Sequence, residues 1–241
     1  IVFPELATHG YWLGQATGAA GLAASDPRLA ELAAGETDVL VGLHEHASVR
    51  SYNAAAYLSG GRVVHVHRKL YLPTYLSWEE RKHSSPGQTL RAFDTVHGRA
   101  AVLICNDAWQ PVLPWLAAQD GAELILVPAN SAATSNPDLL DTAAYWEQIL
   151  VTIARMQQCW LVFVNRAGEE AGARFWGGSR VLDPTGAVVA RAPLWEESLT
   201  FVDIDLAAAR RRRRELPFLA EARLAVIERE VRRLLEEGGD G

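Results

Sequence analysis

The sequence has few cysteines, no long apolar run and no excess of positive charge. Only two cysteines occur in 241 residues, too few for a disulfide framework, which favours a reducing, cytoplasmic setting. No apolar run approaches the roughly 20 residues that span a bilayer, and no signal-peptide pattern is present, so we expect no membrane partner. The formal net charge of −6 argues against nucleic acid as a partner.

What is present is the composition of one large globular domain. The 49% hydrophobic content is ordinary for a folded chain, and the length is sufficient to bury a substantial core. No repeat or linker interrupts the chain, so we expect a single domain over residues 1–241. The chain opens on "IVFPE" without a methionine. This start indicates the end of a strand already under way, and a native start further upstream.

Alternating strand and helix patterns predict an α/β fold. Short runs rich in Val, Ile and Leu indicate buried strands at 39–43, 100–104, 123–128 and 160–164. Residues 111–121 have a helical pattern closed by a glycine suited to a C-cap. A longer helix is expected after Asn136, with Pro137 at its first position. Its apolar face consists of residues three and four apart, namely Leu139, Ala143, Trp146, Leu150 and Ile153.

The last third of the chain continues the α/β pattern. The turn "DPTG" at 183–186 predicts a hairpin over 178–190. A last strand is expected at 199–205, followed by a charged helix from about 219 to 237. Five arginines at 210–214 lie in an acidic chain without interleaved aromatics. They indicate a solvated or subunit-facing segment rather than a nucleic-acid site.

The stretch "VLICNDAW", residues 102–109, places a cysteine where an apolar run turns polar. At the end of a strand, Cys105 would emerge at the carboxyl edge of a sheet, where catalytic groups collect in α/β folds. A helix N-terminus beyond it would favour the thiolate. Position alone also fits a buried structural cysteine. Cys159 lies among apolar neighbours and is expected in the core, and no C-x-x-C spacing supports a metal site.

A nucleophilic thiol needs a base and an oxyanion stabiliser. Two charged residues at other strand ends are candidates. Glu5 closes the run "IVFPEL", and Lys69 follows the alternating "RVVHVHRK". Each alone would ordinarily be a solvated surface charge. Three such residue types, each ending a separate strand, are harder to explain as unrelated surface residues.

The histidines supply no clear Cys-His-Asn arrangement. His44 and His46 lie on one expected strand, and His65 and His67 alternate along another. A His-x-His pair could bind metal, but no third ligand suggests itself. An exposed strand face is therefore the expectation for these pairs.

Several blocks resemble the nitrilase superfamily of carbon–nitrogen hydrolases in the right order. They are "IVFPELATHGYW", "HRKLYLPTYLSWEERKHSSPGQTLRAFDT", "AAVLICNDAWQP" and "GAELILVPANS", followed by "FVNRAG", "FWGGSRVLDPTGAVVARAP" and "FVDIDL". The resemblance runs from residue 1 to about residue 205. It implies a four-layer α-β-β-α sandwich, here without the family's first strand and helix, and a homodimer or higher homo-oligomer.

The resemblance also assigns roles to particular residues. The family's base falls on Glu5, its lysine on Lys69 and its nucleophile on Cys105. A second glutamate falls on Glu80 rather than Glu79, because Trp78 to Arg81 matches the family's aromatic–acidic–Glu–Arg block in that register. The alternative for both glutamates is a solvated loop. Glu5, if desolvated, would be suited to take the thiol proton. Lys69 and the backbone N–H of Asn106 could hold the oxyanion, and Glu80 would orient Lys69. The resemblance implies no metal and no organic cofactor.

Pocket residues and substrate class follow from the same resemblance. Asn106 stands where true nitrilases usually have tryptophan, which favours a small amide or ureido (N-carbamoyl) substrate over a nitrile. Asn130 and Ser131 end the next strand and should line the pocket. Three aromatic side chains could shape it, although aromatics are more often core. They are Tyr11, Trp109 and Trp146.

Three functions remain open from sequence. The first is a stand-alone amidase or carbamoylase-type hydrolase. The second is a glutaminase unit that feeds ammonia to a separate synthetase, because "LPTYLSWEER" resembles glutamine-dependent NAD synthetases. The third is a degenerate, non-enzymatic family member that acts as a binding or assembly subunit, against which the intact Glu5, Lys69 and Cys105 argue.

Overall fold

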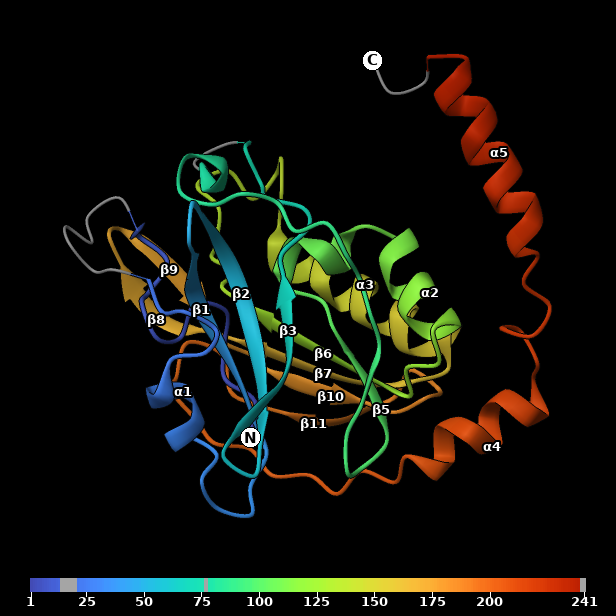
Figure 1. The fold of residues 1–241 in the computed structure, drawn as a ribbon, viewed down its shortest axis with the longest axis horizontal. Coiled ribbons are helices and arrows are strands. Elements are labelled where there is room, and N and C mark those ends of the chain that lie inside the picture. Colours follow the sequence, from blue (N-terminus) through green and yellow to red (C-terminus); the bar gives the residue numbers. More distant parts are fainter. Residues whose placement is uncertain (14–20, 76–77, 239–241) are drawn as a thin grey trace.

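Two β-sheets form the centre of the molecule (Figure 1). The computed structural model describes residues 1–13, 21–75 and 78–238. The first sheet is antiparallel, in the order β1-β2-β3. Its strands are β1 (Val39–Ala47), β2 (Arg50–Ser59) and β3 (Arg62–Arg68). Residues 1–3 run beside β1, where Val2 forms a parallel bridge with Leu40.

The second sheet has six strands, in the order β11-β10-β7-β6-β5-β4. Its middle strands β5, β6 and β7 are parallel, and its outer strands pair antiparallel. The strands are β4 (Phe93–Asp94), β5 (Arg99–Val102), β6 (Leu124–Ala129), β7 (Trp160–Asn165), β10 (Arg180–Leu182) and β11 (Val188–Arg191). A separate hairpin consists of β8 (Ala167–Glu170) and β9 (Ala173–Trp176).

Five α-helices and two short 3-10 helices accompany the described strands. The α-helices are α1 (Pro27–Glu31), α2 (Val112–Gln119), α3 (Thr142–Gln157), α4 (Ala207–Glu215) and α5 (Leu224–Glu236). The 3-10 helices are η2 (Glu80–Lys82) and η3 (Cys105–Trp109). Among the described residues, no helix combines the length and the apolar character needed to cross a bilayer.

Three apolar clusters show how these elements pack. One joins the inner faces of the two sheets, with Leu40 and Ala55 from the first against Val102 and Leu126 from the second. A larger cluster lies between the six-stranded sheet and helices α2 and α3, and Trp146 of α3 is fully buried in it. A third places α1 on the outer face of the first sheet. The sheets therefore meet face to face.

The structure confirms much of the sequence pattern. Strands β5, β6 and β7 lie within two residues of their expected runs, and β1 covers the run 39–43 but continues to Ala47. Helix α2 falls inside 111–121, and β10 and β11 pair around the 183–186 turn. Cys159 is fully buried in the core, as expected. The α/β class is thus correct.

One helix boundary and one strand were predicted wrongly. Helix α3 begins at Thr142, because the carboxylate of Asp141 caps it by accepting from the backbone N–H of Ala144. Pro137 therefore lies before the helix, and Leu139 is 63% exposed instead of on its buried face. The expected strand at 199–205 joins neither sheet. Its alternate residues Val202 and Ile204 are nevertheless half-buried and pack on the cluster of Trp160 and Val181, without the hydrogen-bond ladder of a strand.

The carboxyl-terminal region differs in two further ways. The arginines at 210–214 belong to helix α4, and Arg213 is partly buried, donating to the carbonyls of Ala122 and Gln157. The expected charged helix starts at Leu224 rather than near 219. Figure 1 shows α5 extending away from the body of the molecule.

Candidate active site

Glu5 lies in the segment that follows the short pairing of residues 1–3 with β1. Its side chain is fully buried. The segment approaches β1 closely because position 42 is glycine: a Cβ there would meet the backbone nitrogen of Leu6 at 2.3 Å and the carbonyl oxygen of Pro4 at 2.5 Å. Gly42 is therefore what allows Glu5 to reach the interior of the site.

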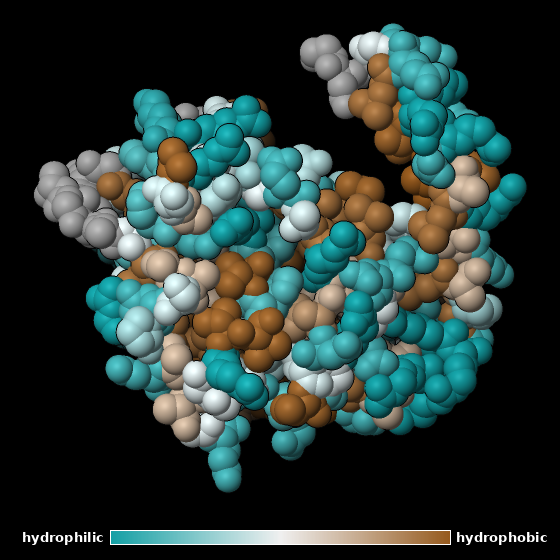
Figure 2. Space-filling view, viewed as in Figure 1, coloured by the Kyte–Doolittle hydropathy of each residue, from teal (hydrophilic) through white to brown (hydrophobic). Residues whose placement is uncertain are grey.

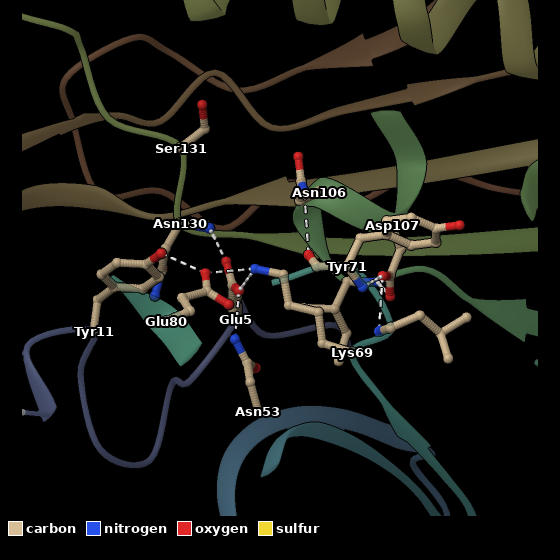
Figure 3. Close-up of polar contacts among 12 residues, drawn as sticks. Glu5, Tyr11, Asn53, Lys69, Tyr71, Glu80, Asn106, Asp107, Asn130 and Ser131 are labelled. Atoms are coloured by element: carbon tan, nitrogen blue, oxygen red, sulfur yellow. Dashed lines mark hydrogen bonds and ion pairs between the residues drawn. The ribbon is translucent and has the colours of Figure 1, made fainter. Parts of the chain in front are cut away.

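Lys69 is the first residue after β3 and carries the central charge of the site. Its Nζ lies 2.7 Å from Oε1 of Glu5 and 2.6 Å from Oε1 of Glu80 (Figure 3). Lys69 is completely buried, and Glu80, on η2, is 9% exposed. The solvated loop considered for Glu80 is thus wrong, whereas Glu79 is exposed. The structure brings the predicted lysine and both predicted glutamates into one buried ionic cluster.

Further partners fix the two carboxylates. Glu5 accepts from Nδ2 of Asn53 at 2.7 Å and from the backbone N–H of Asn130 at 2.8 Å. The hydroxyl of Tyr11 donates to Glu80 (Figure 3). Asn53 comes from the middle of β2, and sequence reasoning missed it. The only signal was a polar residue within the buried run "NAAAYL", which by itself does not reveal the direction of the side chain.

Cys105 opens the 3-10 helix η3, three residues after the last residue of β5. Its backbone is left-handed, with φ +46°, an unfavourable conformation for a residue with a side chain that is typical of constrained functional positions. It is partly buried and lines a small cavity of about 40 Å³. All six predicted pocket residues line the same cavity: Tyr11, Asn106, Trp109, Asn130, Ser131 and Trp146.

The cavity also has walls that sequence reasoning did not identify. They include Pro73, Tyr75, Trp78, Leu140 and Thr142. Trp109 stacks on Tyr145 and contacts the edge of Trp146. Among the described lining residues, the side chains are mostly aromatic or apolar, with amide and hydroxyl groups near Cys105. A loop residue such as Tyr75 gives no sequence signal of its own, because only tertiary packing brings it to the cysteine.

Burial and charge determine the protonation of the site. Burial raises the pKa of the Cys105 thiol well above its ordinary value, and the carboxylates of Glu5 and Glu80 add to this. Lys69 and the backbone N–H of Asn130 act in the opposite direction. The helix N-terminus expected to favour the thiolate is only the short η3, and the raised pKa of Cys105 favours the thiol over the thiolate. A base is therefore needed to activate it.

Lys69 and Glu80 respond to burial in different ways. Burial alone would lower the pKa of Lys69, but Glu5 and Glu80 raise it well above its ordinary value, so the ammonium stays charged. Burial raises the pKa of Glu80, although Lys69 partly opposes the change. Such strongly perturbed groups beside a cavity are characteristic of functional sites.

The histidines do not all match the expected exposed strand face. His46 is exposed and His65 is half-buried against Phe93, but His67 is 2% exposed and contacts the equally buried Asp107. His67 was misassigned because strand periodicity places alternate residues on one face without showing which face is covered. Among the described residues, no three His, Cys, Asp or Glu side chains come together as a metal-ligand set.

The family of the chain follows from comparison with known proteins. The family model described as carbon-nitrogen hydrolase matches residues 1–214. The protein therefore belongs to the carbon–nitrogen hydrolases of the nitrilase superfamily, which its sequence blocks resemble.

Relatives in this family have several different names. A probable nitrilase of Schizosaccharomyces pombe is 33% identical over 86% of this chain and 75% of that protein. A glutamine-dependent NAD(+) synthetase of Thermotoga maritima is 31% identical over 65% of this chain but only 27% of that protein. An omega-amidase of Bos taurus is 28% identical over 87% of this chain and 76% of that protein.

Solved structures establish the fold. An amidase from Nesterenkonia sp. AN1 superposes with a TM-score of 0.78 at 23% identity, covering 95% of this chain and 84% of that one. The α/β carbon–nitrogen hydrolase fold predicted from sequence is thus confirmed.

Proposed function

We propose that the protein hydrolyses a non-peptide carbon–nitrogen bond in a small amide or ureido compound through a thioester on Cys105. The observation that carries the proposal is a fully buried Lys69 held between Glu5 and Glu80 beside that cysteine. Burying an ion cluster costs hydration free energy, and apolar residues would fill a core at lower cost. Family membership and the amidase relatives support the same chemistry.

In the first half of the reaction, Glu5 accepts the Sγ proton of Cys105 as the sulfur attacks the carbonyl carbon. The carbonyl π electrons move to oxygen, and Nζ of Lys69 and the backbone N–H of Asn106 stabilise the oxyanion. The intermediate then collapses: the carbon–nitrogen bond breaks as Glu5 returns its proton to the leaving nitrogen. Ammonia or an amine departs, and the acyl group remains on sulfur as a thioester.

In the second half, a water molecule attacks the thioester carbon while Glu5 takes one of its protons. The carbon–sulfur bond breaks, the sulfur recovers that proton from Glu5, and the acid or carbamate product leaves. Glu80 keeps Lys69 charged and directed toward the oxyanion through both halves. The protein's own residues supply every proton transfer. A four-layer α-β-β-α order, which the three apolar clusters support, is the framework we propose for this site.

An ammonia-release assay on amides, N-carbamoyl amino acids, glutamine and nitriles tests the proposal. We expect turnover of at least one amide or ureido compound and loss of that turnover in Cys105→Ala. The matched control is Cys159→Ala, which removes the other, buried thiol and should keep activity. Equal turnover by Cys105→Ala would exclude the thioester mechanism, and inactivity of the wild type on the whole panel would favour the degenerate, non-enzymatic alternative.

A glutaminase unit is the second candidate, favoured by the NAD(+) synthetase relatives. Glutamine in the same panel distinguishes it, since a glutaminase should release ammonia from glutamine faster than from simple amides. Nitrile hydrolysis is the third, in view of the probable nitrilase relative. Asn106 beside the nucleophile remains our reason to expect amides to be better substrates than the corresponding nitriles.

A further inference from the structure

The carboxylate of Asp107 lies two residues after the proposed nucleophile and joins separate parts of the chain. Its Oδ1 accepts from the backbone N–H groups of Leu70 and Tyr71, both at 2.9 Å (Figure 3). Its Oδ2 accepts from the backbone N–H of Ile104 at 3.1 Å. One buried side chain therefore holds the residues that follow Lys69 and the residue that precedes Cys105.

His67 completes the hydrogen bonding of this carboxylate. Its Nε2 lies 2.9 Å from Oδ2 of Asp107, and both side chains are essentially inaccessible to solvent. Because an ionised carboxylate only accepts, Nε2 is the donor in this pair. With four hydrogen bonds on two oxygens, all the acceptor positions of Asp107 are occupied.

The two segments held by Asp107 are those whose geometry the proposed reaction requires. Cys105 has a left-handed backbone that must be maintained by surrounding contacts. Lys69 lies two residues beyond His67 and directly follows the end of β3, and in the proposed reaction its ammonium must meet the oxyanion formed at the cysteine. A displacement of about 1 Å between reacting groups can cost about 10²-fold in rate.

We propose that His67 and Asp107 are a positioning pair that fixes Cys105 relative to Lys69. This proposal rests on the function proposed above. His67 keeps the Asp107 carboxylate in the orientation that receives three backbone N–H groups. Without that donor, one oxygen loses a partner in a site that water does not reach, and the carboxylate can turn away from Ile104 or Leu70. The nucleophile and the oxyanion-stabilising ammonium would then lose their mutual alignment.

The test compares His67→Leu with His67→Gln. Gln carries an amide N–H at about the reach of Nε2, whereas Leu has no donor. Iodoacetamide titration gives the amount of reactive Cys105, and kcat is expressed per titrated thiol. We expect this kcat to fall by about tenfold to a hundredfold in His67→Leu, with KM within about threefold of the wild type. His67→Gln should retain kcat within about threefold of the wild type. If His67→Leu does not fold, His67→Asn takes its place, because its shorter amide stops short of Oδ2.

The matched control is His65→Leu, on the same strand and stacked on Phe93 away from Asp107, which should leave kcat unchanged. The inference is overturned if His67→Leu, or His67→Asn in its place, keeps wild-type kcat per titrated thiol, even when its melting temperature falls. It is equally overturned if His67→Gln loses as much kcat as that variant. Either result leaves the proposed function intact, because that depends on wild-type turnover and on Cys105→Ala.

Discussion

Lys69 contacts two carboxylates in a part of the molecule that water does not reach. Removing one partner from such a cluster leaves an uncompensated buried charge, which typically costs about 3–5 kcal/mol of folding free energy. For this reason, we expect variants of Glu5 or Lys69 to lose stability as well as the proposed activity. Cys105 is a better first substitution, because its thiol is uncharged at rest and its loss leaves the ion pairs in place.

His65 provides a prediction of pH-dependent stability. Burial, with a smaller contribution from His67, lowers its pKa to about 4, whereas in the unfolded chain it is near its ordinary value of about 6.5. The unfolded state therefore binds more protons below that value. The stability contributed by neutral His65 is present above pH 6.5 and is lost as the pH falls toward 4.

Between pH 7 and pH 4.5, we expect protonation of His65 in the unfolded chain to lower the free energy of unfolding by about 2 kcal/mol, allowing for the partial exposure of the side chain. Urea denaturation of wild type and His65→Gln at pH 7 and pH 4.5 measures the effect. The variant should lose less stability than the wild type over this interval. Parallel losses in the two proteins would show that His65 does not titrate as described.

At the scale of elements, two glycines let separate segments meet. Gly42 of β1 lies against the segment of Glu5. At Gly87, an added Cβ would lie only 2.2 Å from the carbonyl oxygen of Arg68. The backbone N–H of Gly87 also donates to the carbonyl of Lys69 at 2.8 Å. The absence of a side chain at these positions decides where two of the proposed catalytic residues lie.

Gly42→Ala should therefore impair the site from a distance. The new methyl group would overlap the backbone of Pro4 and Leu6 and push Glu5 away from Lys69. We expect kcat/KM to fall by about 10²-fold, since a shift of about 1 Å is enough. Gly35→Ala is the control, because an added Cβ there meets nothing within 4 Å. Equal kinetics of the two variants would contradict this role of Gly42.

The elements themselves were predictable to different degrees. Buried strands such as β6 and β7 have apolar runs that few other structures accommodate, so their positions follow from sequence. The start of α3 depended on whether Pro137 or Asp141 begins the helix, and a local pattern fits both. The segment 199–205 has strand-like alternation, but pairing requires a neighbouring strand, which tertiary structure alone supplies.

At the scale of the whole molecule, α5 lies outside the hydrophobic core (Figure 1). None of its residues is buried, and Leu224, Val231 and Leu235 are each at least half exposed. With Ile227 and Leu234 they form one apolar face. Apolar side chains, coloured brown, run along this arm in Figure 2. Near the start of α5, Ile227 lines a groove with residues of α2 and α3.

The family resemblance implies a homo-oligomer, and we propose that self-association covers this face. Replacing Leu224, Val231 and Leu235 by Gln keeps the helix but removes most of its apolar surface. We expect the variant to sediment at lower mass than the wild type at the same concentration, with a melting temperature within about 2 °C, since the core is untouched. Identical sedimentation of the two proteins would argue that α5 takes no part in self-association.

The sequence by itself determined the chemical groups of the proposed site and the class of the fold. Apolar runs of strand length located β1, β5, β6 and β7, and Glu5, Lys69, Glu80 and Cys105 were identified, in order, from blocks that resemble one family. Tertiary structure alone decided which polar residues turn inward. Asn53, His67 and Asp107 are positioned by contacts between segments distant in sequence, and a side chain's burial depends on what packs over it rather than on its neighbours along the chain.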